Sequence, residues 1–129
     1  MSILLPRDQS FESACVDRVF NQRRPARCPL AIVRASSPND VRTAIELAKE
    51  LKCDISVRGG GHSWAGWSIR DNSVLIDLGG LNAISYDETT GIVKAGPAVT
   101  ADQLNSVLVG KGRIFNGPHC PSVGLGGFL

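Results

Sequence analysis

The sequence predicts an α+β domain in which a small mixed sheet has flanking helices. Two segments have the apolar spacing of amphipathic helices, residues 37–53 and 100–112. Three short apolar runs have the length of strands, residues 28–36, 54–58 and 73–78. Residues 82–99 alternate between apolar and polar positions on both sides of an Asp-Glu-Thr-Thr-Gly turn, which indicates a β-hairpin.

The helix at residues 37–53 has clear start signals. Ser37 can cap it, Pro38 suits its first position, and Asp40 is favourable in its first turn. Its apolar stripe, which should face the core, consists of Val41, Ala44, Ile45, Ala48 and Leu51. The second helix has Thr100 as its cap and a glycine at its end.

The flanking segments are less regular. Residues 1–27 are predicted as a helical lead-in, with a weak helix at residues 9–20. Residues 113–115 should form a brief strand, after which the chain becomes rich in glycine and proline. Because an apolar, glycine-rich ending lacks the polar surface of a usual terminus, we expect the natural fold to continue beyond Leu129.

Composition narrows the class of protein. The 129 residues are 43% hydrophobic and 20% charged, as in one ordinary globular domain. The net charge is +2, and the one basic cluster, residues 21–27, is expected to be a solvated turn, so no nucleic-acid partner is predicted. Pro6 interrupts the only apolar run near the start, which predicts neither a signal peptide nor a membrane span and leaves a cytoplasmic location as the default.

The first segment with chemical potential is "RGGGHSWAGWS", Arg58 to Ser68, which follows a predicted strand. Successive amides in a glycine-rich turn can form a concave nest for a phosphate or pyrophosphate. The segment lacks the Lys-Ser/Thr ending of a P-loop and the GxGxxG fingerprint. The alternative is a tight turn in which His62 packs against Trp64 or Trp67.

The second such segment is "GPHCPSVGLGG", which pairs Cys120 with another glycine-rich turn. Cys120 is either a reactive thiol beside His119 or a small buried residue. The other cysteines, Cys15, Cys28 and Cys53, are expected to be buried thiols without disulfides. No spacing suits a metal, and nothing arranges a hydrolytic triad.

The succession of "RGGGHS", "VLIDLGGLNAISYDETTGIVKAGPAVTADQLNSVLVGKG" and "CPSVGLGG" resembles one family. It is similar to the FAD-binding domain of the berberine bridge enzyme-like oxidases, in the vanillyl-alcohol oxidase/PCMH superfamily. The resemblance spans residues 28–129 and covers the N-terminal part of a PCMH-type FAD-binding domain. It implies FAD as cofactor, oxygen as electron acceptor and a small-molecule substrate.

The resemblance also implies roles for individual residues. The loop from Arg58 to Ser63 matches the segment whose backbone holds the FAD pyrophosphate. His62 and Cys120 match the two residues that attach covalently to the flavin. The cofactor-binding residues implied in this way are Arg58, Gly59, Gly60, Gly61, His62, Ser63, Cys120, Val123, Gly124, Gly126 and Gly127.

Further predictions concern residues in and near the two glycine loops. Arg58 either braces its loop or lies near the pyrophosphate, and the sequence does not separate these alternatives. Trp64 and Trp67 are expected to pack under the loop, and Asp77 is expected to be a turn or strand-end residue and not a catalytic acid. Since both glycine loops face one flavin in the family, the side chains of His62 and Cys120 should lie within about 10 Å of each other.

The family's substrate domain and catalytic base have no counterpart here, so no catalytic residue is assigned to this chain. The first interpretation is the FAD-binding portion of an FAD-linked oxidase. The alternative is a truncated, non-catalytic module that binds flavin weakly or not at all and forms a homodimer through exposed core. A third interpretation is a relic that acts only through association with a partner.

Overall fold

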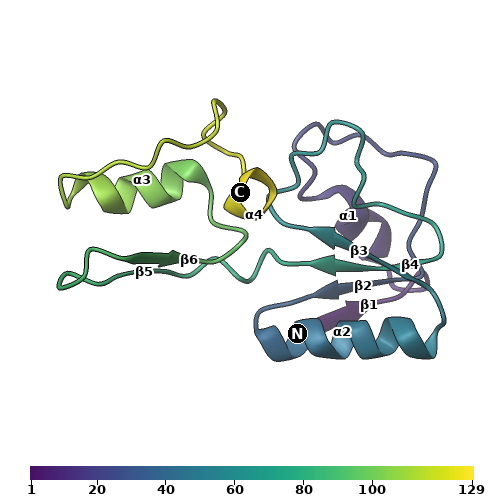
Figure 1. Cartoon of the computed structure of the whole chain (residues 1–129). Helices are drawn as coiled ribbons and strands as arrows, with labels where there is room; N and C mark the ends of the chain where they lie inside the picture. Colours follow the sequence, from purple (N-terminus) through teal and green to yellow (C-terminus); the bar gives the residue numbers. More distant parts are fainter.

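The computed structural model describes residues 1–129 and confirms a mixed sheet with flanking helices (Figure 1). In chain order the elements are β1 (Ser2–Leu4), α1 (Phe11–Val16), β2 (Ala31–Arg34), α2 (Pro38–Glu50), β3 (Asp54–Arg58), β4 (Ser73–Asp77), β5 (Ile84–Tyr86), β6 (Val93–Ala95), α3 (Ala101–Val109) and α4 (Leu125–Phe128). None of these helices is long and apolar enough to cross a bilayer.

The main sheet has the strand order β1-β2-β4-β3. Strands β2, β4 and β3 run parallel, and β1 pairs antiparallel with β2. Every residue of the central strand β4 is buried, because helices cover both faces of a sheet built from parallel crossovers. The parallel strands therefore end at one common edge, and the glycine loop begins where β3 ends.

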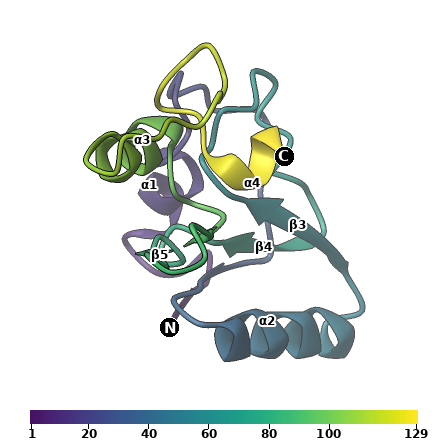
Figure 2. The same cartoon turned by 60° about the vertical axis from the view of Figure 1, so that its left-hand side comes forward.

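Helix α2 covers one face of this sheet, and α1 lies on the other (Figures 1 and 2). The capping box predicted at its start is present, with reciprocal hydrogen bonds between Ser37 and Asp40. Ala44 and Ala48 of the predicted stripe are buried against β2 and β4. Leu51 is 45% exposed, which corrects the prediction that it faces the core, because α2 ends before it.

The N-terminal segment contributes more to the sheet than predicted. Residues 1–27 contain a strand as well as a helix, because the apolar run at Ser2–Leu4 pairs with β2. Helix α1 is shorter than the predicted residues 9–20, and it buries Phe11 and Ala14 against β2 and β4. The lead-in is therefore part of the core.

The hairpin and the second helix form a separate layer beside the main sheet (Figure 1). Strands β5 and β6 pair as predicted, and Thr100 caps α3 in a capping box with Gln103. The predicted strand at residues 113–115 is absent. Instead the Asn105 side chain binds the Phe115 backbone at both its N–H and its C=O, so these groups are satisfied without a strand partner.

A buried ion pair joins the ends of the two central strands. Arg58 donates from Nη2 to Asp77 Oδ2 over 2.6 Å, and both side chains are nearly inaccessible to water. Arg58 also donates to the carbonyl oxygens of Ala14 and Cys15 in α1, and Arg18 donates to Asp77. Burial raises the pKa of Asp77, but the Arg58 charge and hydrogen bonds outweigh this effect and hold the pKa below its ordinary value.

Arg58→Met should lower the free energy of unfolding by about 3–5 kcal/mol, because it leaves the Asp77 carboxylate buried with too few partners. Arg34→Met is the matched control, since Arg34 and Asp17 form an ion pair that is more than a third exposed and contributes about 1 kcal/mol or less. Urea unfolding of both variants measures the difference. Equal losses in the two variants would contradict this account of the Arg58–Asp77 pair.

Candidate functional site

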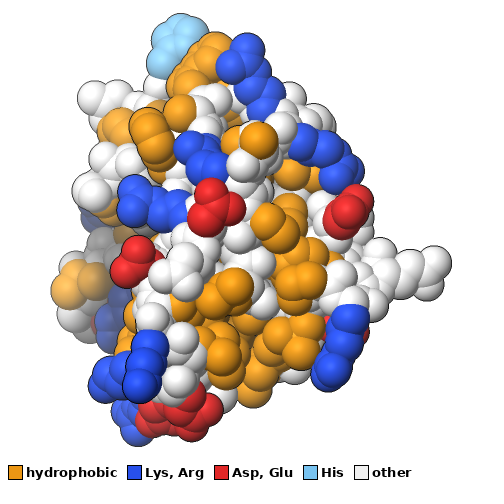
Figure 3. All heavy atoms as spheres, turned by 90° about the vertical axis from the view of Figure 1, so that its right-hand side faces the viewer, with side chains coloured by type: hydrophobic (Ala, Val, Ile, Leu, Met, Phe, Trp, Pro, Cys, Tyr) orange, Lys and Arg blue, Asp and Glu red, His pale blue; other side chains and the backbone are white.

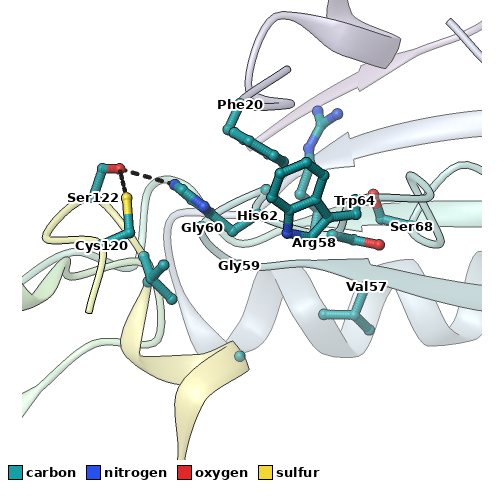
Figure 4. A pocket seen from close by; sticks show the side chains of 15 residues that line it. Phe20, Val57, Arg58, Gly59, Gly60, His62, Trp64, Ser68, Cys120 and Ser122 are labelled. Carbon is teal, nitrogen blue, oxygen red and sulfur yellow. Dashed lines mark hydrogen bonds between the residues drawn. The ribbon is translucent and has the colours of Figure 1, made fainter. Parts of the chain in front are cut away.

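A cavity of about 650 Å³ opens where β3 ends, within the size range of ligand pockets (Figure 4). Both glycine loops line it, the first with Gly59, Gly60 and Gly61 and the second with Val123 and Gly124. The same cavity is also lined by His62, Ser63, Cys120 and Gly127. The structure therefore brings together two motifs that are about sixty residues apart in the chain.

The first loop presents backbone donors without partners. The N–H groups of Gly59, Gly60 and Gly61 donate to no backbone group of the chain. The loop is nevertheless held in place, because Arg18 donates to the Gly59 carbonyl oxygen over 2.8 Å and the Phe20 N–H donates to the Gly61 carbonyl oxygen. Consecutive free amides at a fixed turn form the kind of nest that binds an anion.

Glycine is required where the two loops meet. A Cβ on Gly60 would lie 2.4 Å from the backbone nitrogen of Gly124, closer than any real contact. At Gly61 a Cβ would lie 1.7 Å from the Arg18 carbonyl oxygen, and the φ angle of +72° favours glycine as well. Close approach of other backbone segments, and not chain flexibility, explains why residues 60 and 61 are glycine.

The two nucleophilic side chains meet at a serine. His62 Nε2 lies 2.9 Å from the Ser122 Oγ, and the same oxygen lies 3.2 Å from Cys120 Sγ (Figure 4). The separation of the imidazole nitrogen and the sulfur therefore cannot exceed these two distances laid end to end. This is well inside the expected 10 Å, so the predicted proximity of His62 and Cys120 is confirmed.

Ser122 also affects the thiol. Its hydroxyl and a backbone hydrogen bond lower the pKa of the exposed Cys120 thiol. Because the thiolate is the nucleophilic form of cysteine, a lower pKa increases its reactivity near neutral pH. The alternative of a small buried residue does not apply to Cys120, which is exposed.

The His62 ring is held by an aromatic partner from outside both loops. The rings of Phe20 and His62 stack, with centroids 4.6 Å apart and an angle of 8° between planes. Trp64 lies edge-on to Phe20, 77% exposed, and Trp67 is 61% exposed beside the Arg27 guanidinium. The prediction that both tryptophans pack under the loop is therefore wrong, because Phe20 fills that place.

Two predicted site residues, Arg58 and Gly126, make their main contacts with other parts of the fold. Arg58 lines the cavity, while its guanidinium donates to Asp77 and to the Ala14 carbonyl oxygen of α1, so the side chain braces the start of the loop. Gly126 does not line the cavity, because its N–H donates to the Pro97 carbonyl oxygen and a Cβ there would meet Pro97. Asp77 ends β4, as predicted.

Sequence reasoning did not single out Phe20 or Ser122. Ser122 lies inside the quoted "CPSVGLGG" motif, between the cysteine and the first glycine, so its position was a usable signal. Phe20 had no signal, since it lies 42 residues before its partner in a segment without periodicity. No group of three or more metal-ligating side chains occurs, and all four cysteines are free. Cys28 is exposed and Cys15 and Cys53 are half-buried, which corrects the expected burial of these three thiols.

Comparison of the sequence with known proteins finds FAD-binding domains and FAD-linked oxidoreductases. A family model described as an FAD binding domain matches residues 29–129. The chain is 44% identical over 127 residues to FAD-linked oxidoreductase ptmO of Penicillium ochrochloron, covering 98% of this chain and 28% of that protein. It is 33% identical over 112 residues to a carbohydrate oxidase of Microdochium nivale, covering 84% of this chain and 22% of that protein.

The fold has close structural counterparts. The structure of BBE-like protein 28 from Arabidopsis thaliana superposes with a TM-score of 0.84 at 26% identity, over 96% of this chain and 27% of that chain. The present chain spans less than a third of the length of the curated relatives described above.

Gly60→Ala should reduce stability by about 1–3 kcal/mol, because its Cβ would force the two loops apart. Gly127→Ala is the matched control within the same wall, since nothing lies within 4 Å of its Cβ and alanine favours the α4 helix. Thermal unfolding should show a lower midpoint for Gly60→Ala and an unchanged or slightly higher one for Gly127→Ala. A Gly60→Ala variant as stable as the parent would show that the loops do not need this close approach.

Proposed function

The chain belongs to the FAD binding domain family, and from this membership we propose that it is the FAD-binding part of an oxidase that uses oxygen as its electron acceptor. The berberine bridge enzyme-like assignment and the PCMH-type fold predicted from the sequence are confirmed at the level of the family and the fold. The substrate and the oxygen acceptor belong to the proposed activity of the whole enzyme. The name of the Microdochium nivale relative, a carbohydrate oxidase, supports a small molecule that the enzyme oxidises as substrate.

The observation that carries the proposal is the row of free amides at Gly59, Gly60 and Gly61 on the cavity wall. Three adjacent donors without acceptors in the chain suit an anionic ligand group, and a pyrophosphate supplies several acceptor oxygens. All three glycines line the cavity, so a ligand in it can approach their backbone closely. The residues of this structure therefore fit the cofactor, which would be held by its pyrophosphate at the first loop.

We propose further that His62 and Cys120 are the two attachment points for the flavin. Both side chains line the same cavity, and Ser122 holds them together. The lowered pKa of Cys120 and the ordered ring of His62 suit two nucleophiles that must meet one electrophilic ring system. Bound FAD would supply the two-electron acceptor that no side chain provides. His62 and Cys120 would fix it, and neither is assigned a proton-transfer role in turnover.

Acid denaturation of the FAD-loaded chain tests both parts of the proposal. The denatured protein should stay yellow and carry the mass of one FAD, less the hydrogens lost on bonding. The double variant His62→Ala/Cys120→Ala should lose the colour on denaturation. The matched control, His119→Ala/Cys53→Ala, removes the same residue types outside the cavity and should keep it.

Three outcomes separate the claims. If the folded parent binds FAD but releases it on denaturation, covalent attachment is overturned and FAD binding is not. A parent chain that takes up no FAD would overturn both. Colour retained by the His62→Ala/Cys120→Ala variant would place the attachment on other residues.

A second candidate function, self-association, is favoured by exposed apolar side chains at the opposite end of the sheet. Leu30, Leu51 and Ile55 are each at least 40% exposed and lie where β2 and β3 begin and α2 ends. Figure 3 faces this end and shows hydrophobic side chains gathered there, with charged ones around them. An apolar cluster of this kind is typical of an interaction surface. We propose that it allows two copies of this chain to associate.

Sedimentation over a range of protein concentrations tests this association. The parent should form a dimer that Ile55→Lys disrupts, because the lysine places a charge inside the apolar cluster. Val109→Lys is the control, since Val109 is 65% exposed on the distant helix α3. A parent that remains monomeric at every concentration would exclude the dimer.

A further inference from the structure

A second hollow, of about 240 Å³, lies on the α1 side of the molecule and contains two cysteines. Cys15 comes from α1, and Cys28 comes from the segment that precedes β2. Phe11, Val16 and Ile69 form its apolar wall. None of these residues lines the larger cavity between the two glycine loops, so the proposed function does not use them.

The two thiols line the same small hollow, and the Cys28 thiol donates to the Pro29 carbonyl oxygen over 3.6 Å. Their backbones are fixed by contacts to distant parts of the chain. The Cys15 carbonyl oxygen accepts from Arg58 Nη1 over 2.6 Å, and the Cys28 N–H donates to Asp71 Oδ1 over 2.9 Å. Since a disulfide forms only where the backbone holds two cysteines near one another, fixed proximity is the required starting condition.

The two cysteines differ in exposure. Cys28 is exposed, whereas Cys15 is half-buried in the apolar wall. Burial, followed by the neighbouring Cys28 thiol, raises the pKa of Cys15 to about 11, although the positive charges of Arg58 and Arg24 partly oppose this. An oxidant from solvent therefore meets the Cys28 sulfur first, and Cys15 remains a thiol beside it.

We propose that Cys15 and Cys28 are a redox-active pair that a hydroperoxide converts into a reversible intramolecular disulfide. Hydrogen peroxide transfers one oxygen to the Cys28 thiol, which gives a sulfenic acid and one water. The Cys15 sulfur then attacks the Cys28 sulfur and displaces the hydroxyl, which leaves with the Cys15 proton as a second water. Two thiols are oxidised by two electrons in total, and one peroxide is reduced to two waters.

The bridge would close a loop that is connected to the flavin cavity. Between the two cysteines lie Arg18, which donates to Asp77 and to Gly59, and Phe20, which stacks on His62. Closing this short loop restricts the unfolded chain and therefore stabilises the fold. When peroxide is present, oxidation would therefore fix the segment between Cys15 and Cys28, which orders the rim of the larger cavity.

The test uses the full 129-residue chain without FAD, so that its result does not depend on the proposed function. Peroxide treatment, blocking of the remaining thiols and peptide mapping should identify one cross-linked peptide joining Cys15 to Cys28. The intact mass should fall by two hydrogen atoms. The unfolding midpoint should rise by on the order of 10 °C, and dithiothreitol should reverse both changes.

Two serine variants serve as comparison. Cys28→Ser should abolish the mass loss and the rise in midpoint, and its exposed position makes it compatible with folding. Cys53→Ser should retain both, because Cys53 packs on the opposite face of the sheet, with α2.

Two results would overturn the proposal. The first is gain of two or three oxygen atoms at Cys28 with Cys15 still reduced, which would show that the thiols cannot meet. The second is a Cys28 disulfide between two chains, seen as a dimer on a non-reducing gel.

Discussion

The buried contact between Arg58 and Asp77 is the interaction on which the rest of the structure depends. It joins the ends of β3 and β4, and through the carbonyl oxygens of Ala14 and Cys15 it fixes α1 to the same point. A guanidinium that is fully buried must satisfy its donors within the protein. Arg58 does so with one carboxylate and two helix carbonyls, so three segments share a single anchor.

The glycine loop starts from this anchor, and its properties follow from that position. A loop attached to a rigid strand end can keep its amides free and still hold them in one orientation. The second loop reaches it only because Gly60 and Gly124 carry no side chains. A pre-formed site of this kind avoids the cost of ordering a loop when a ligand binds.

The segment from Cys15 to Cys28 connects the core to the cavity rim. Arg18 binds Asp77 and Gly59, and Phe20 stacks on His62. Helix α1 itself is anchored by Arg58, so a change in this segment reaches both the buried ion pair and the His62 ring. The fold therefore links the N-terminal residues, which have no motif of their own, to the most chemically capable part of the chain.

The sequence by itself determined the elements between residues 31 and 109 and the two glycine motifs, but not strand β1, which exists only by pairing with β2. Caps at Ser37 and Thr100, apolar periodicity and the hairpin turn are local signals, because each depends on neighbours within a few residues. Tertiary structure alone decided which distant residues meet: Phe20 with His62, Ser122 with both nucleophiles, and Gly60 with Gly124. It also placed Trp64 and Trp67 outside and Arg58 inside. Contacts between distant residues arise from how whole elements pack, and no short pattern contains that information.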